Sequence, residues 1–133
     1  MTQYVAAYAA TAIVMIALDL LWLGVIAKPL YQQGIGHLMA EQPNIPVAVL
    51  FYAVFALGIV VFAVLPNGPG SAWSKAAIAG ALFGFFAYAT YDLTNLATLK
   101  NWPLGLSILD MAWGSLVSAV AAVAGKSVMD RLS

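Results

Sequence analysis

The sequence contains no cysteine and only one histidine, His37. The lack of cysteine excludes disulfides, thiolate metal sites and cysteine nucleophiles. Glu41 follows His37 by four residues, but two ligands do not make a metal site, and the presence of a metal elsewhere stays open. No phosphate-binding loop, nucleophile elbow or zinc-binding histidine pair occurs, so the sequence indicates no cofactor and no catalytic residue.

Charge is also scarce, at 8% of 133 residues, and five basic residues balance five acidic ones. No basic tract is present, which excludes an evident nucleic-acid partner. Hydrophobic residues make up 64% of the chain. A soluble domain of this size has no core large enough to bury them. We therefore expect one membrane domain, residues 1–133, whose main partner is the lipid bilayer.

Four apolar stretches reach the length of about 20 residues that a membrane-spanning helix needs. The first has no Lys or Arg before it and is too long for a signal peptide, so we expect it to be retained. Proline stands at the first turn of the second and fourth stretches, where a helix accepts it. The predicted fold is an all-α integral membrane protein, a bundle of four transmembrane helices with short loops, spanning residues 4–27, 45–65, 73–99 and 103–124.

The last two spans are joined only by "KNW", so we expect them to be antiparallel neighbours. Small residues recur in both at four-residue spacing, which lets membrane helices approach closely. The same ridges would also serve a homo-oligomer, which stays an alternative. These residues are Ala76, Gly80, Gly84, Gly114, Ser118 and Ala122.

The loops carry weaker signals. Lys75, Lys126 and Arg131 lie on the side of the termini, against Lys28 and Lys100 on the other. The positive-inside rule therefore favours cytoplasmic termini by three to two, with dual topology as an alternative.

Aromatic and apolar residues near the span ends predict contact with the membrane interface. Trp73 and Trp102 stand at span ends and are interpreted as interfacial anchors. Between the first two spans, one helical face carries apolar side chains and predicts a segment lying in the interface. That face comprises Tyr31, Ile35, Leu38 and Met39.

Three aspartates interrupt the apolar spans: Asp19, Asp92 and Asp110. Counted from the span ends, and with the fourth span running back, all three lie on the same side of the midplane. A helix rises about 1.5 Å per residue, which places each aspartate about 10–12 Å below the boundary marked by Lys28 and Lys100. An exposed carboxylate at the bilayer centre costs about 2.5–3.5 kcal/mol, so we expect the three to face one another inside the bundle.

Polar or aromatic companions share the helical faces of these aspartates, mostly at a spacing of three residues. We predict that the acids and their companions form one ligand- or ion-binding site. The predicted companions are Trp22, Asn95, Trp113, Tyr88 and Ser107.

The segments "LDLLWLG", "YDLTNLATLKNWP" and "DMAWG" resemble those of a family of small bacterial membrane proteins, catalogued as domain of unknown function 2177. The similarity covers nearly the whole chain. The resemblance implies a four-helix, multi-pass protein of the bacterial inner membrane. It implies no activity, substrate or catalytic residue.

Three functions are compatible with these residues. In the first, the carboxylates bind or transport a cation, a proton or a small cationic solute. In the second, the chain is a subunit of a lipid-modifying membrane enzyme, with paired acids as general acid and base. In the third, it is a structural or assembly subunit whose acids lock helices together. The lack of a nucleophile or metal cage disfavours the second. Three acids at one depth are more than helix packing needs, which disfavours the third, so we favour the first.

Overall fold

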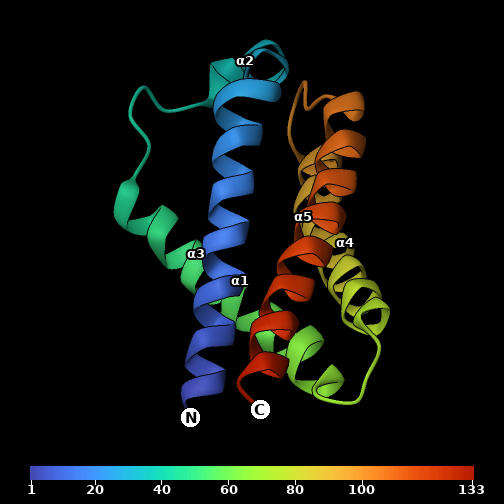
Figure 1. Ribbon diagram of the computed structural model, residues 1–133. Helices are drawn as coiled ribbons and strands as arrows, with labels where there is room; N and C mark the ends of the chain where they lie inside the picture. The colour runs from blue at the N-terminus through green and yellow to red at the C-terminus, as the bar shows by residue number, and fades with distance from the viewer.

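Helices account for nearly the whole chain in the computed structural model, which describes residues 1–133 (Figure 1). No strand is present, and four helical stretches are long and apolar enough to cross a membrane. The predicted fold class, an all-α membrane protein with four spanning helices, is therefore confirmed. These stretches are Thr2–Ile26, Ile45–Asn67, Trp73–Thr98 and Leu104–Arg131.

The first span changes its winding near its end. α1 (Thr2–Leu21) continues into a π-helical turn, η1 (Trp22–Ile26), in which the Ala27 amide donates to the Trp22 carbonyl at 2.7 Å. Such wider turns inside a helix often occur at functional sites. Asp19 lies in the last turn before the change and is 4% exposed.

The second span begins with α3 (Ile45–Ile59), whose start is specified by the local sequence. The Asn44 side chain accepts a hydrogen bond from the Val47 amide at 3.2 Å, and proline occupies the first turn. An asparagine cap of this kind satisfies one of the free amides at a helix start. A π-helical turn, η3 (Val60–Val64), and a 3-10 turn, η4 (Leu65–Asn67), complete the span.

The third and fourth spans, α4 (Trp73–Thr98) and α5 (Leu104–Arg131), form the most extensive helix pair, as the short link and small residues predicted. At Gly80 an added Cβ would lie 2.7 Å from the Ser118 carbonyl oxygen, and at Gly84 it would overlap the Gly114 carbonyl. Only glycine allows backbones to come this close.

α5 continues past the apolar run that predicted it and ends at Arg131 rather than near Ala124. Lys126, although 2% exposed, is neutralised by Asp130 one turn later at 2.7 Å. Its ammonium also donates to the Gly68 carbonyl at 2.9 Å. A paired lysine can therefore lie within the packed end of the bundle.

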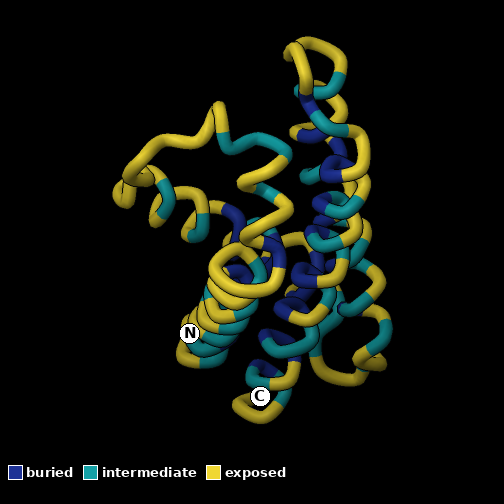
Figure 2. The backbone as a smooth tube through the Cα atoms, turned by 90° about the horizontal axis from the view of Figure 1, so that it is seen from above, coloured by how far each residue is buried: buried dark blue, intermediate teal, exposed yellow.

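The apolar core lies toward the end of the bundle that holds both termini. Figure 2 shows that buried residues follow the inner sides of the helices, whereas the loops are mostly exposed. The members of the core come from the first, second and fourth spans, and four of the largest are almost completely buried. These four are Met15, Ile59, Val64 and Val117.

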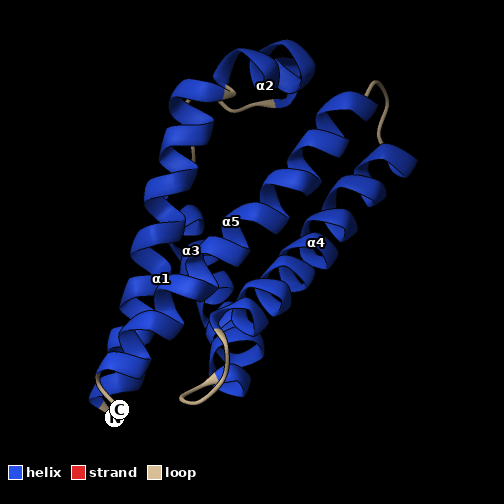
Figure 3. Ribbon diagram, turned by 45° about the vertical axis from the view of Figure 1, so that its right-hand side comes forward, coloured by secondary structure: helices blue, strands red, loops and turns tan.

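The opposite end carries α2 (Lys28–Ile35), a 3-10 turn, η2 (Gly36–Leu38), and the link between α4 and α5 (Figure 3). The prediction of an interfacial face is wrong for Tyr31 and Ile35. Tyr31 and Ile35 turn into the bundle, whereas Leu38 and Met39 are about half exposed beyond the helix. α2 is therefore a cover over this end of the bundle, and Gly34 lies against the Pro103 ring.

Candidate functional site

A cavity of about 560 Å³ lies beneath α2, between the four spans. Most of its lining is apolar, but each of the four spans and α2 contributes an acid or an aromatic ring. These residues are Asp19, Tyr31, Tyr52, Tyr88, Tyr91, Asp92, Trp102, Asp110 and Trp113. We call this hollow the acid cavity.

Asp19 has a hydrogen-bond donor on each oxygen. The Tyr52 hydroxyl, from α3, donates to Oδ2 at 2.8 Å, and the Trp113 indole, from α5, donates to Oδ1 at 2.7 Å. Hydrogen bonds to a charged acceptor are stronger than neutral ones. These two bonds connect the first, second and fourth spans and hold the carboxylate in a fixed position.

Asp110 is held from above by α2. The Tyr31 hydroxyl donates to Oδ1 of Asp110 at 2.5 Å and accepts a bond from the Trp22 indole at 3.3 Å. Burial raises the pKa of the Tyr31 hydroxyl above its ordinary value, and the bond to Asp110 raises it further. The hydroxyl therefore stays protonated at neutral pH and remains a donor.

A ring stack joins the two hydrogen-bonded groups. Trp22 and Trp113 lie parallel, with centroids 4.4 Å apart and an interplanar angle of 5°. Because Trp113 donates to Asp19 and Trp22 to Tyr31, the stack links the surroundings of Asp19 to those of Asp110. A change in the charge or the position of either acid is therefore expected to affect both indole rings of this stack.

Asp92 differs from the other two acids. It is 1% exposed, it lies beside the Asp110 carboxyl, and its Oδ2 has no hydrogen-bond partner. Buried polar atoms nearly always have a partner, so such an atom needs an explanation. Tyr88, one turn earlier on α4, also lines the cavity, and its ring occupies the space where Gly114 has no side chain.

No lysine, arginine or histidine lines the acid cavity. Lys28 and Lys100, at this end of the bundle, are exposed, and the buried Lys126 is bonded to Asp130 far from the cavity. The three carboxylates are not arranged as a set that would hold a metal ion. The cavity thus gathers acids and aromatic rings without a protein cation.

The structure brings most of the predicted site residues together. Asp19, Asp92 and Asp110 all line the acid cavity, as do Tyr88 and Trp113. Trp22 lies behind Trp113 and contacts the site through its stack and its bond to Tyr31.

Two predicted residues lie outside the lining. Ser107 is fully buried, accepts from the Trp102 indole at 2.9 Å and donates to the Pro103 carbonyl at 2.9 Å. Asn95 lies one turn nearer the end of α4 and is directed toward Tyr91. Ser107 therefore orients a lining residue, and Asn95 flanks the site.

The interpretation of Trp102 as an interfacial anchor is wrong. This side chain is 9% exposed, lines the cavity and meets Tyr91 edge to face at 5.8 Å. Its bond to Ser107 turns the indole inward. Trp73, by contrast, is 66% exposed at the start of α4, as an anchor would be.

Sequence reasoning missed Tyr31, Tyr52 and Tyr91 as site residues. Tyr91 was within reach, because it immediately precedes Asp92 on the same span. Tyr52 is one of few polar groups in the second span, and a buried hydroxyl there needs a partner. Tyr31 gave no usable signal, because its role depends on α2 folding back over the bundle.

The family model described as "Predicted membrane protein (DUF2177)" matches residues 4–127. The chain therefore belongs to this family, as the sequence motifs indicated. No curated protein and no solved structure matches the chain.

Proposed function

We propose that this membrane protein binds a small organic cation in the acid cavity. The observation that carries the proposal is the set of three buried carboxylates with no basic side chain among the lining residues. Buried charges in proteins are normally paired. A bound cation would supply the missing partner.

The arrangement of the acids favours one place for the cation. Both oxygens of Asp19 already accept hydrogen bonds, and so does Oδ1 of Asp110. Asp92 retains an unpartnered oxygen beside Asp110. We therefore place the positive charge next to Asp92 and Asp110, with Asp19 adding to the negative potential.

The aromatic lining favours an organic cation over a bare ion. Rings of Tyr88, Tyr91, Trp102 and Trp113 surround the acids. Aromatic faces attract alkylated ammonium groups, and this attraction strengthens where water is displaced. A volume of about 560 Å³ suits a small molecule.

The location of the protein is part of the proposal. The family resemblance supports the bacterial inner membrane. The larger number of Lys and Arg residues near the termini supports cytoplasmic termini. In that orientation α2 and the acid cavity lie toward the periplasmic side.

Equilibrium binding of tetraethylammonium to the detergent-solubilised protein tests the proposal. Tryptophan fluorescence is a suitable signal, because Trp22, Trp102 and Trp113 belong to the site and only Trp73 is remote. We expect saturable binding whose affinity falls at least about tenfold, or about 1.4 kcal/mol, in Asp92→Asn.

Glu41→Gln is the matched control, because it removes one negative charge from an exposed loop. Its affinity should equal that of the wild type. Equal losses of affinity in Asp92→Asn and Glu41→Gln would show that binding depends on the overall charge of the protein and not on the acid cavity. No saturable binding by the folded wild-type protein would contradict the proposed function.

A further inference from the structure

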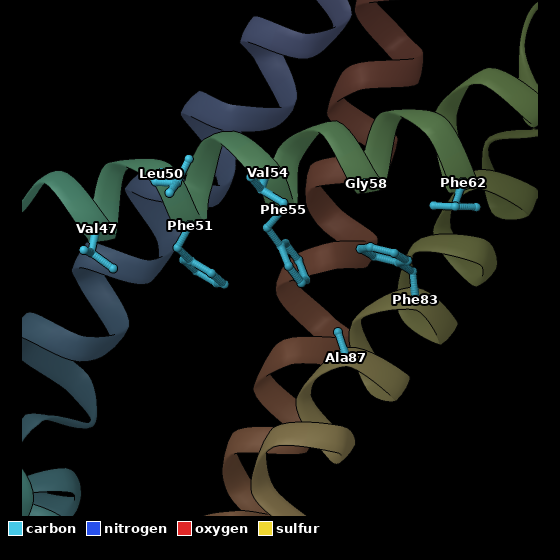
Figure 4. A pocket seen from close by; sticks show the side chains of 9 residues that line it. All are labelled: Val47, Leu50, Phe51, Val54, Phe55, Gly58, Phe62, Phe83 and Ala87. Atoms are coloured by element: carbon cyan, nitrogen blue, oxygen red, sulfur yellow. The ribbon is translucent and has the colours of Figure 1, made fainter.

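A second hollow, of about 540 Å³, lies beside the acid cavity, between α3 and α4 (Figure 4). Its lining is almost entirely hydrophobic and includes Val47, Val54 and Phe62 on the second span and Phe83 on α4. All of these positions belong to membrane-spanning helices. We call this hollow the lateral groove.

The groove exists because the second and third spans meet only at one end. A Cβ added at Gly58 would lie 2.5 Å from the Phe83 ring, so the two helices touch there. α4 packs against η3, beyond that point, but hardly at all along α3. Toward Val47 the helices therefore diverge, and the space between them is lined by exposed apolar side chains (Figure 4).

The lateral groove adjoins the acid cavity directly. Phe51, Phe55 and Ala87 line both hollows, so the two hollows meet along these three side chains. The Phe55 ring lies 5.8 Å from that of Tyr88, which faces the acids. The apolar groove thus borders the cavity that holds the three acids.

We propose that the lateral groove holds the alkyl chain of an amphipathic ammonium compound whose cationic head lies in the acid cavity. This inference rests on the proposed function and specifies its ligand class. Charge complementarity selects the head, because the cavity holds three acids and no base. The shared lining favours a chain attached to that head, because the two hollows meet at Phe51 and Phe55. Such a ligand would reach the site sideways from the bilayer.

The test uses dodecyltrimethylammonium with a photoreactive diazirine at the end of its chain, added to the full-length protein in phosphatidylcholine vesicles. Labelled residues are mapped by mass spectrometry. We expect labelling of groove residues to exceed that of the exposed Leu82 severalfold. Excess tetramethylammonium, which has a head but no chain, should reduce groove labelling at least fivefold.

A pair of variants separates the groove from the general lipid surface. Val54→Trp fills the groove, whereas Val49→Trp places the same ring on α3 outside both hollows. Both valines are 61% exposed, so neither change disturbs the core. Val54→Trp should abolish groove labelling and leave tetramethylammonium binding unchanged, and Val49→Trp should alter neither.

The possible failures are distinguishable. Even labelling over the lipid-facing surface, or groove labelling that tetramethylammonium does not reduce, would overturn the inference while cation binding stands. A disulfide between two copies of Val54→Cys would also overturn it, because a second copy would then occupy the groove. If neither tetraethylammonium nor tetramethylammonium binds the folded protein saturably, both the inference and the proposed function are overturned.

Discussion

Replacing Gly84 by leucine should force α4 and α5 apart. The first added atom, Cβ, would overlap the Gly114 carbonyl and lie 2.7 Å from the Ser118 Cβ. A backbone carbonyl cannot rotate away as a side chain does, so the helices themselves must move. Overpacking of this kind costs about 1–3 kcal/mol, and we expect the upper end of that range.

The magnitude is measured against a matched substitution. Leucine favours the helix over glycine by about 0.5–1 kcal/mol, which offsets part of the clash at Gly84 and leaves a net loss of about 2 kcal/mol. Gly105 lies in the same helix pair, and nothing would lie within 4 Å of an added Cβ. Gly105→Leu should therefore be neutral or stabilising by up to about 1 kcal/mol.

The assay is unfolding of the protein in mixed micelles by sodium dodecyl sulfate, followed by the near-ultraviolet circular dichroism of the tryptophans. The two variants should differ in free energy of unfolding by about 2–3 kcal/mol, from the terms above. Equal effects of Gly84→Leu and Gly105→Leu would refute the close contact of α4 with α5.

Three further predictions concern other parts of the bundle. Cysteines introduced at Gln33 and Ser133 should react with an impermeant reagent from opposite faces of the membrane, and labelling of both from one face would contradict the four-span topology. Tyr31→Phe removes the hydroxyl that joins α2 to α5 and should destabilise the protein by about 2 kcal/mol, as loss of a hydrogen bond to a charged group does, whereas Tyr4→Phe at an exposed position should not. Asn44→Ala removes the cap of α3 and should cost about 1 kcal/mol in the same unfolding assay, and an unchanged free energy would show that the cap is dispensable.

The helices were predictable because the bilayer allows few alternatives. Every backbone group in a lipid-exposed span must bond within the helix, so length and hydropathy alone indicate the element. The short link between α4 and α5 and the glycines at fixed spacing then determined which helices touch. The end of α5 was harder to place, because Lys126 enters the packed region only with Asp130 beside it.

The meeting of the three aspartates in one cavity was predictable for a similar reason. The rise of a helix is fixed, so counting residues from a span end gives a level in the membrane. The structure accordingly places Asp19, Asp92 and Asp110 on the walls of one cavity. What each carboxylate binds is a separate question that spacing does not answer.

The tyrosines and Trp102 could not be placed from spacing, because their positions depend on helix rotation and on how connecting segments fold back. Tyr31 reaches Asp110 across 79 positions of sequence, and Tyr52 reaches Asp19 across 33. Trp102 stands where an interfacial anchor would stand, but it bonds to Ser107 and packs against Tyr91 inside the bundle. Asn95 shares a helical face with Asp92 but lies beyond the level of the cavity.

The most direct test of cation binding is a crystal structure of the protein soaked with tetramethylarsonium, an organic cation whose arsenic is located by anomalous scattering. The account predicts one anomalous peak inside the acid cavity, between Asp92 and Asp110 and next to the rings of Tyr88 and Trp113. A peak only at the protein surface, or an empty cavity at saturating cation, would contradict it.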